Sequence, residues 1–145
     1  MKKTDGRKLH TQFSGIVKEQ LKKAGYDVKA SDNRSFDIYV GDAKCKINTH
    51  KNIKGSVVIE YATDKHNMLD AGYDKIVYMD VADGAKNEIY IAPVQTVAKA
   101  IQNRLGRSQH YFQCSRKDVL ENTGLCVGIS VAAFKNIEGV ETIIF

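Results

Sequence analysis

The sequence predicts an α/β (α+β) domain in which helices flank a central mixed sheet. Three observations predict this class: an amphipathic helical repeat near the N-terminus, a hairpin with strict alternation, and a strand–strand–helix series further along. The chain has 145 residues, of which 43% are hydrophobic and 27% charged, as in ordinary globular domains. We therefore expect one domain over 1–145 with its core in about 8–105. Residues 106–145 either complete that core or form an interface.

The first predicted element is a helix over residues 8–24. Its apolar residues recur at the three- and four-residue spacing of a single helix face. Gly25 follows them, at the position where a left-handed residue usually ends a helix. We expect a short strand at about 27–30 after this glycine.

A β-hairpin is predicted over residues 36–47. Apolar residues alternate on both sides of Gly41-Asp42, a two-residue turn with glycine first. Such a turn fixes the register, which pairs Ile38 with Cys45 and Asp37 with Lys46. The apolar face then carries Phe36, Ile38, Val40, Ala43, Cys45 and Ile47, and the polar face carries Asp37, Tyr39, Lys44 and Lys46.

Further strands and helices are predicted where β-branched and aromatic residues cluster or where helical spacing returns. The central ones are strands at 57–61, 75–81 and 88–91, a short helix at about 64–71, a turn at Asp83-Gly84, and a helix after Pro93 that Gly106 closes. The C-terminal ones are strands at 110–114 and 140–145 and a small helix at 115–122, while 126–134 fits a helix or a strand equally.

Composition narrows the class of protein. The net charge of +5 permits binding to phosphates without establishing it. Three cysteines without Cys-x-x-Cys spacing predict reduced thiols and a cytoplasmic location. No apolar run reaches the ~20 residues of a membrane helix, and no signal peptide is visible, so we expect no membrane partner.

The order of the predicted elements, together with two short segments, suggests a known family. Ala24-Gly25-Tyr26-Asp27-Val28 after the first helix, followed by Phe36-Asp37-Ile38-Tyr39-Val40, resembles the start of a PD-(D/E)XK nuclease domain. Tyr73–Val81, then Ile89-Tyr90-Ile91-Ala92-Pro93 and a helix, is similar to small members such as intron-encoded endonucleases. The resemblance covers about residues 8–105 and implies the restriction-endonuclease-like αβββαβ core.

The resemblance implies a metal-dependent site. In that family two acids hold Mg²⁺, and a lysine helps to activate a water that attacks the phosphate. Asp37 matches the first acid and Lys46 matches the lysine. Lys44 stands where the second acid is expected, and a lysine there would repel Mg²⁺.

A second placement of the motif supplies the missing acid. Glu60 then holds Mg²⁺ with Asp37, although Ala62 stands where the lysine belongs. Glu19, on the first helix, is near the position of the family's helical acid. Neither placement completes the motif, and a solvated Asp–Lys pair on a hairpin explains Asp37 and Lys46 as well.

Two basic clusters favour a polyanionic partner, because cations release counterions from nucleic acid and aromatic rings stack on bases. The alternative is an ordinary solvated surface, since cations are also favoured at helix C-termini. The predicted nucleic-acid-binding residues are Lys44, Lys51 and Lys54 in the first cluster and Arg104, Arg107, Arg116 and Lys117 in the second.

The leading prediction is a metal-dependent DNA endonuclease or resolvase-like phosphodiesterase, acting as a homodimer or homotetramer. Asp37 and Glu60 would hold Mg²⁺, and Lys46 would assist the attacking water. The alternative is a catalytically inactive member that binds nucleic acid or protein, for example an accessory or inhibitor protein from a phage or mobile element. Lys44 in the acid position favours that alternative.

Overall fold

The computed structural model describes residues 14–33, 35–48, 56–62, 68–79, 88–105, 111–112 and 125–145. It begins with a helix at residues 14–23, the described part of the predicted N-terminal helix. The elements that follow are β1 (Val28–Ala30), β2 (Ile38–Val40), β3 (Ala43–Asn48), β4 (Ser56–Ala62), β5 (Lys75–Met79), β6 (Glu88–Pro93), α2 (Val94–Leu105), β7 (Tyr111–Phe112), β8 (Leu125–Ser130), α4 (Val131–Lys135) and β9 (Glu141–Ile144).

The strands form two sheets. A six-stranded sheet has the order β1-β2-β3-β5-β6-β9, and it is mixed because β3 and β5 are parallel whereas its other neighbours are antiparallel. A three-stranded antiparallel sheet has the order β4-β8-β7. The predicted α+β class with a central mixed sheet is therefore confirmed.

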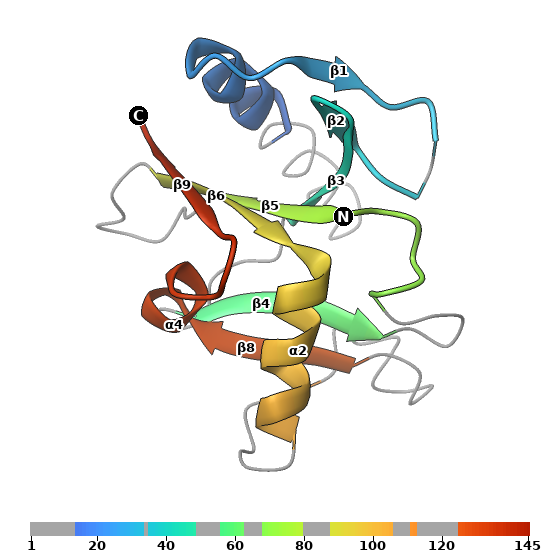
Figure 1. Ribbon diagram of the computed structural model, residues 1–145, viewed down its shortest axis with the longest axis vertical. Coiled ribbons are helices and arrows are strands. Elements are labelled where there is room, and N and C mark those ends of the chain that lie inside the picture. The colour runs from blue at the N-terminus through green and yellow to red at the C-terminus, as the bar shows by residue number, and fades with distance from the viewer. Residues whose placement is uncertain are drawn as a thin grey trace, which may run out of the picture.

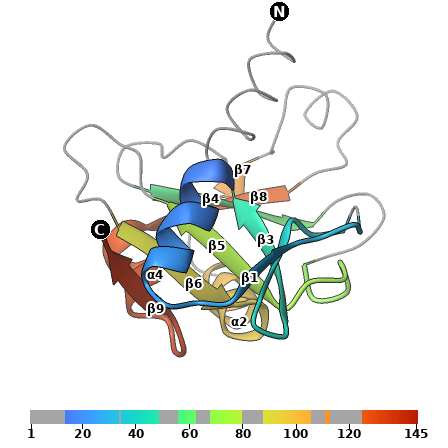
Figure 2. The ribbon, with the colours of Figure 1, turned by 90° about the horizontal axis from the view of Figure 1, so that it is seen from above.

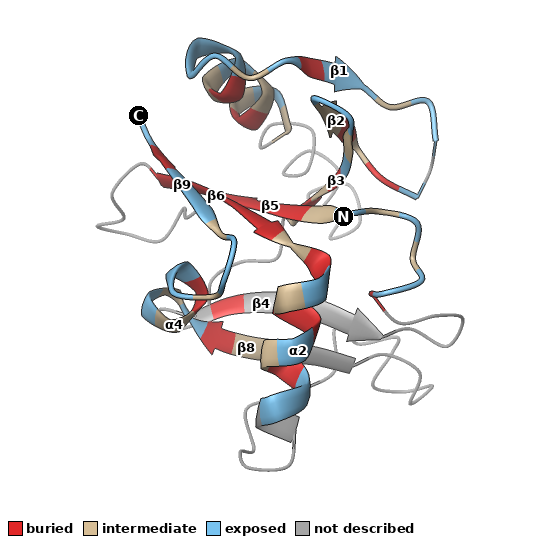
Figure 3. Ribbon diagram, in the orientation of Figure 1, coloured by how far each residue is buried: buried red, intermediate tan, exposed pale blue. Residues whose placement is uncertain are grey.

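The elements are layered on both faces of the six-stranded sheet (Figure 1). On one face, Val17 and Leu21 of the helix at residues 14–23 pack in one apolar cluster with Val77 and Ile91. Figure 2 shows this helix lying over β5 and β6. On the other face, α2, α4 and the three-stranded sheet enclose a second apolar cluster. Strands β5 and β6 are consequently the buried centre of the molecule (Figure 3).

The hairpin of β2 and β3 has the predicted register. Ile38 pairs with Cys45, and Gly41 has a φ of 60°, as the first position of a primed turn requires. The prediction for Phe36 was wrong. Its buried ring contacts Tyr39 and the Lys44 ammonium, which both lie on the face opposite Ile38, because the regular strand begins only at residue 38.

The connection between β3 and β5 differs from the predicted core. The segment 57–61 is a strand as predicted, but β4 belongs to the second sheet. A helix was predicted at about 64–71, and its described part, 68–71, consists of turns and bends. Among the described residues, the parallel β3–β5 crossover thus passes through another sheet, and the restriction-endonuclease-like core stays a prediction.

The ambiguous segment 126–134 changes from strand to helix at one residue. Ser130 ends β8 and caps α4, because its hydroxyl accepts a hydrogen bond from the Ala133 N–H at 3.2 Å. Phe134 is fully buried, and Ile129 and Ile143 are nearly so, which places this part of the chain in the core. The helix predicted at 115–122 lies outside the described residues.

The remaining predictions for the central part hold where the structure describes them. Strands β5 and β6 pair antiparallel, with Tyr78 opposite Tyr90, and α2 directly follows Pro93. The turn at Asp83-Gly84 lies outside the described residues. Neither α2 nor any other helix among the described residues is long and apolar enough to cross a membrane.

Candidate nucleic-acid interface

Three side chains form a row across the first three strands. Lys29 pairs with Tyr39, and Tyr39 pairs with Lys44. Directly paired residues of an antiparallel sheet project on the same side, so two cations flank one aromatic ring. Both lysines are exposed and the tyrosine is half-buried. We call Lys29, Tyr39, Lys44 and the neighbouring Lys46 the basic face.

Aromatic rings orient two lysines of this face. The Lys44 Nζ lies 6.0 Å from the centroid of the Phe36 ring, and the Lys46 Nζ lies 5.6 Å from that of Tyr73. Phe36 in turn meets Tyr39 edge-to-face, with ring centroids 5.0 Å apart. Each contact is a weak cation–π or aromatic interaction, and together they restrict the ammonium groups to the surface of the sheet.

Asp37 lies directly before β2, where its carboxylate is bound to the backbone. Its Oδ2 accepts a hydrogen bond from the Ile47 N–H at 2.7 Å, and its own N–H donates to the Cys45 carbonyl at 3.0 Å. The side chain therefore extends the β2–β3 ladder by one step. The regular β2–β3 pairing ends at Ile38 and Cys45, and the Asp37 N–H donates to the carbonyl of that same Cys45, so the pairing of Asp37 with Lys46 stays a prediction.

Asp74 has an equivalent position on the other edge of β3, and sequence reasoning missed it. Its Oδ2 accepts from the Lys44 N–H at 2.9 Å, and its N–H donates to the Lys44 carbonyl at 2.7 Å. Its carbonyl accepts from the Val94 N–H at 2.9 Å. Asp74 thus joins β3, the start of β5 and the start of α2.

A repeated tetrapeptide could have revealed Asp74. Ala-Gly-Tyr-Asp occurs at 24–27, before β1, and again at 71–74, before β5. The two glycines have nearly the same left-handed conformation, with φ of 95° at Gly25 and 94° at Gly72. The aspartate carbonyl of each copy also accepts a backbone N–H from a later segment. The repeat therefore marks the same strand-entry turn twice.

The predicted acid Glu19 lies on the opposite face of the sheet from Lys44 and Lys46, and Glu60 lies on a strand of the second sheet. Glu19 is exposed on the helix that covers the opposite face of the sheet, where it forms an ion pair with Lys23 at 3.4 Å. Glu60 pairs with Cys126 in the three-stranded sheet, and its side chain lies outside the described residues. No cluster of three His, Cys, Asp or Glu side chains suited to a metal ion occurs among the described residues.

The side chains of the six other predicted nucleic-acid-binding residues lie outside the described part of the structure. Arg104 is in the last turn of α2, and its side chain lies outside the described residues. Five further residues lie wholly outside the described residues: Lys51, Lys54, Arg107, Arg116 and Lys117. Of the predicted set, Lys44 is the residue that the described interface contains.

No known family model matches the chain, and no curated protein is similar to it in sequence. The chemistry of the basic face follows from its own geometry. It offers exposed ammonium groups, which donate to anionic oxygens, and a tyrosine ring between two of them.

Proposed function

We propose that the protein binds nucleic acid through the basic face and holds the strand without cutting it. The observation that carries the proposal is the row Lys29–Tyr39–Lys44, in which two exposed ammonium groups flank one ring. When a nucleic-acid strand lies across this row, its phosphates contact the two lysines and a base or sugar contacts the tyrosine ring.

The charge of the whole chain supports a polyanionic partner. The net charge is +5 and the isoelectric point is about 9.0. Such a charge attracts nucleic acid over a distance comparable to the Debye length, and the lysines of the basic face then replace condensed counterions. Binding of this kind weakens steeply as salt is added.

Two features favour binding over cleavage. Lys44, a cation, stands where the PD-(D/E)XK nucleases have their second acid. One carboxylate oxygen of Asp37 already accepts the Ile47 N–H, which ties that side chain to the strand ladder. A hard cation such as Mg²⁺ requires several oxygen ligands, and Lys44 contributes a positive charge in their place.

The test is a salt titration of binding to fluorescent single-stranded and duplex DNA, followed by anisotropy. Wild type binds, and its affinity falls linearly on a double-logarithmic plot against salt. Lys44→Ala and Lys29→Ala each weaken binding to every sequence and reduce the magnitude of the salt slope by about one.

Lys22→Ala is the matched control, because Lys22 is an exposed lysine on the helix that covers the opposite face of the sheet. Its substitution removes the same charge and leaves the salt slope nearly unchanged. Equal losses in Lys44→Ala and Lys22→Ala would show that net charge alone is responsible. Absence of binding at about 50 mM salt would remove nucleic acid as the partner.

A metal-dependent endonuclease is the second candidate, favoured because the Asp37 carboxylate reaches the N–H of Ile47, the residue after Lys46 on β3. Incubation of plasmid, branched and single-stranded DNA with Mg²⁺ or Mn²⁺, and with EDTA, separates the two functions. A binding protein leaves all three substrates intact. Metal-dependent cleavage that Asp37→Asn abolishes would favour the nuclease instead.

A further inference from the structure

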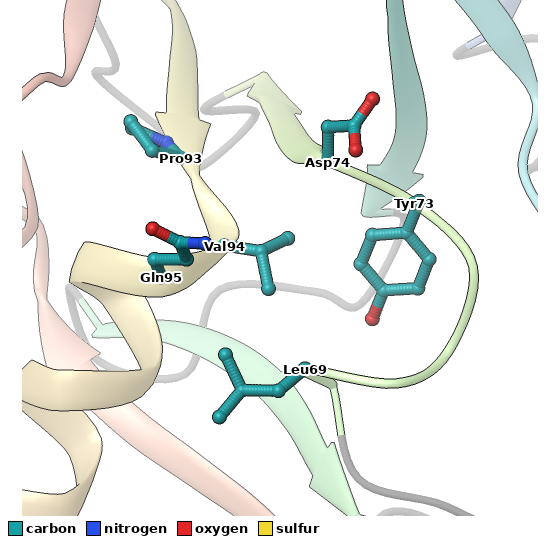
Figure 4. A pocket seen from close by; sticks show the side chains of 6 residues that line it. All are labelled: Leu69, Tyr73, Asp74, Pro93, Val94 and Gln95. Atoms are coloured by element: carbon teal, nitrogen blue, oxygen red, sulfur yellow. The ribbon is translucent and has the colours of Figure 1, made fainter.

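A pocket of about 450 Å³ opens beside the basic face. Its described lining comes from the turn before β5 and from the β6–α2 junction, and consists of Leu69, Tyr73, Asp74, Pro93, Val94 and Gln95. Figure 4 shows Leu69 and Val94 projecting toward the same space, with the Tyr73 ring at its side and the Asp74 carboxylate turned away. The volume is within the ~300–1,000 Å³ typical of small-molecule sites.

Two contacts join this pocket to the basic face. Tyr73 lines the pocket, and the Lys46 Nζ lies 5.6 Å from the centroid of its ring. Asp74, another lining residue, accepts the Lys44 N–H. A nucleic-acid strand whose phosphates lie on Lys44 and Lys46 would therefore pass the mouth of the pocket. One of its nucleotides could then reach into the pocket.

We propose that the pocket takes one unpaired nucleobase of the strand held on the basic face. The inference rests on the proposed function and names the part of the nucleic acid that this surface recognises. A base has two flat apolar faces and a polar edge, which match a lining that combines Leu69 and Val94 with the tyrosine ring and a glutamine amide. The lysines beside the pocket hold the phosphates that flank this base.

The exposure of Leu69 supports an occupant of this kind. Its side chain is 47% exposed, although it is a large hydrophobic residue at the pocket. A base seated between Leu69 and Tyr73 would remove apolar surface from water, which favours binding. An unpaired base enters without breaking a base pair, so single strands, loops and ends are the expected ligands.

The experiment compares a short single-stranded oligonucleotide with an abasic strand of the same length and charge. Wild type binds the strand with bases roughly 5- to 150-fold more tightly, the range that a base–aromatic contact contributes. Tyr73→Ala and Leu69→Ala reduce this preference, whereas Tyr73→Phe, which keeps the ring, retains it. Binding of the abasic strand changes little in all three variants, because its contacts are phosphates on lysines.

Ile144→Ala is the matched control, since Ile144 is another exposed large hydrophobic residue, on β9 at the far edge of the sheet. It leaves the preference for bases intact. Equal binding of both strands by wild type would overturn the base pocket and leave the proposed function standing, as would a preference that is undiminished in Tyr73→Ala and Leu69→Ala. Binding of neither strand at about 50 mM salt would overturn both proposals.

Discussion

At the scale of single residues, Asp37 is a carboxylate that completes a strand ladder. The first prediction separates this structural role from a catalytic one. Asp37→Ala removes the acceptor of the Ile47 N–H and lowers the free energy of unfolding by about 1–3 kcal/mol. Asp37→Asn keeps an acceptor oxygen and costs less. Urea unfolding measures both, and an Asp37→Ala variant as stable as wild type would contradict the assigned hydrogen bond.

Cys45 supplies a second prediction, on pH. Burial raises the pKa of its thiol from 9.0 to about 11, although the nearby Lys75 acts in the opposite direction. Between those values the unfolded chain loses this proton while the folded protein keeps it, so stability present below pH 9 is lost as the pH rises. The full loss amounts to about 3 kcal/mol, at ~1.36 kcal/mol for each of the two pKa units.

Cys45→Ala isolates this effect, because every other group that ionises in alkali is shared with wild type. The free energy of unfolding is measured by urea titration at about pH 8 and about pH 10.5. We expect wild type to lose more stability over this interval than Cys45→Ala. Parallel losses in the two proteins would show that the thiol ionises equally in the folded and unfolded states.

At the scale of elements, polar contacts join the end of the short helix α4 to the start of β6. Glu88, at the start of β6, is buried and accepts a hydrogen bond from the Tyr90 hydroxyl. The Lys135 ammonium, at the end of α4, lies 3.4 Å from the same carboxylate. A helix as short as α4 has little stability of its own, so these contacts and its packing fix its position.

The turn between α4 and β9 carries the third prediction. Gly139 has a φ of 83°, and a Cβ there would lie 2.9 Å from the Pro93 Cγ. Gly139→Ala therefore destabilises the fold in two ways, because it strains the backbone and displaces the rigid Pro93 ring. Gly25→Ala is the matched control, with a φ of 95° and no heavy atom within 4 Å.

We expect Gly25→Ala to lose about 1–2 kcal/mol from left-handed strain alone. Gly139→Ala should lose about 1–3 kcal/mol more, because overpacking adds to that strain. Thermal or urea unfolding of the two variants gives the comparison. Equal losses would mean that the turn moves away from Pro93 at no cost.

At the scale of the whole molecule, local pattern predicted the elements better than their assembly. The β2–β3 register followed from alternation around a two-residue turn, because the pairing of neighbouring segments needs no long-range information. The pattern of 57–61 predicted a strand but could not show which sheet it joins. Tyr73 and Asp74 reach the basic face only because β3 pairs with β5, about 30 residues later in the chain.

The same limit applied to the candidate site. Asp37 was placed beside β3 because both belong to one hairpin, whereas Glu19 lies on a helix that packs on the opposite face. The pocket was not predicted, since its lining combines the turn before β5 with the start of α2. Residues near each other in sequence could be paired from pattern, and those joined by a crossover could not.

The two sheets share one core, which leads to the last prediction. Phe134 is fully buried in the cluster that holds Ile59 of β4 and Tyr90 of β6, with its ring 5.9 Å from that of Tyr90. Phe134→Ala should lower the free energy of unfolding by about 3–5 kcal/mol. Phe134→Leu, which keeps most of the volume, should lose less than about 2 kcal/mol.

Because that core is shared, both sheets should unfold in one transition, in wild type and in the leucine variant. The chain has no tryptophan, so fluorescence reports on its seven tyrosines, of which Tyr78 and Tyr90 lie in the shared core, and far-UV circular dichroism reports on both sheets. Coincident urea curves are expected. A tyrosine transition that precedes the loss of secondary structure would show that the sheets unfold separately, and the pocket beside the β6–α2 junction would then lack a rigid wall.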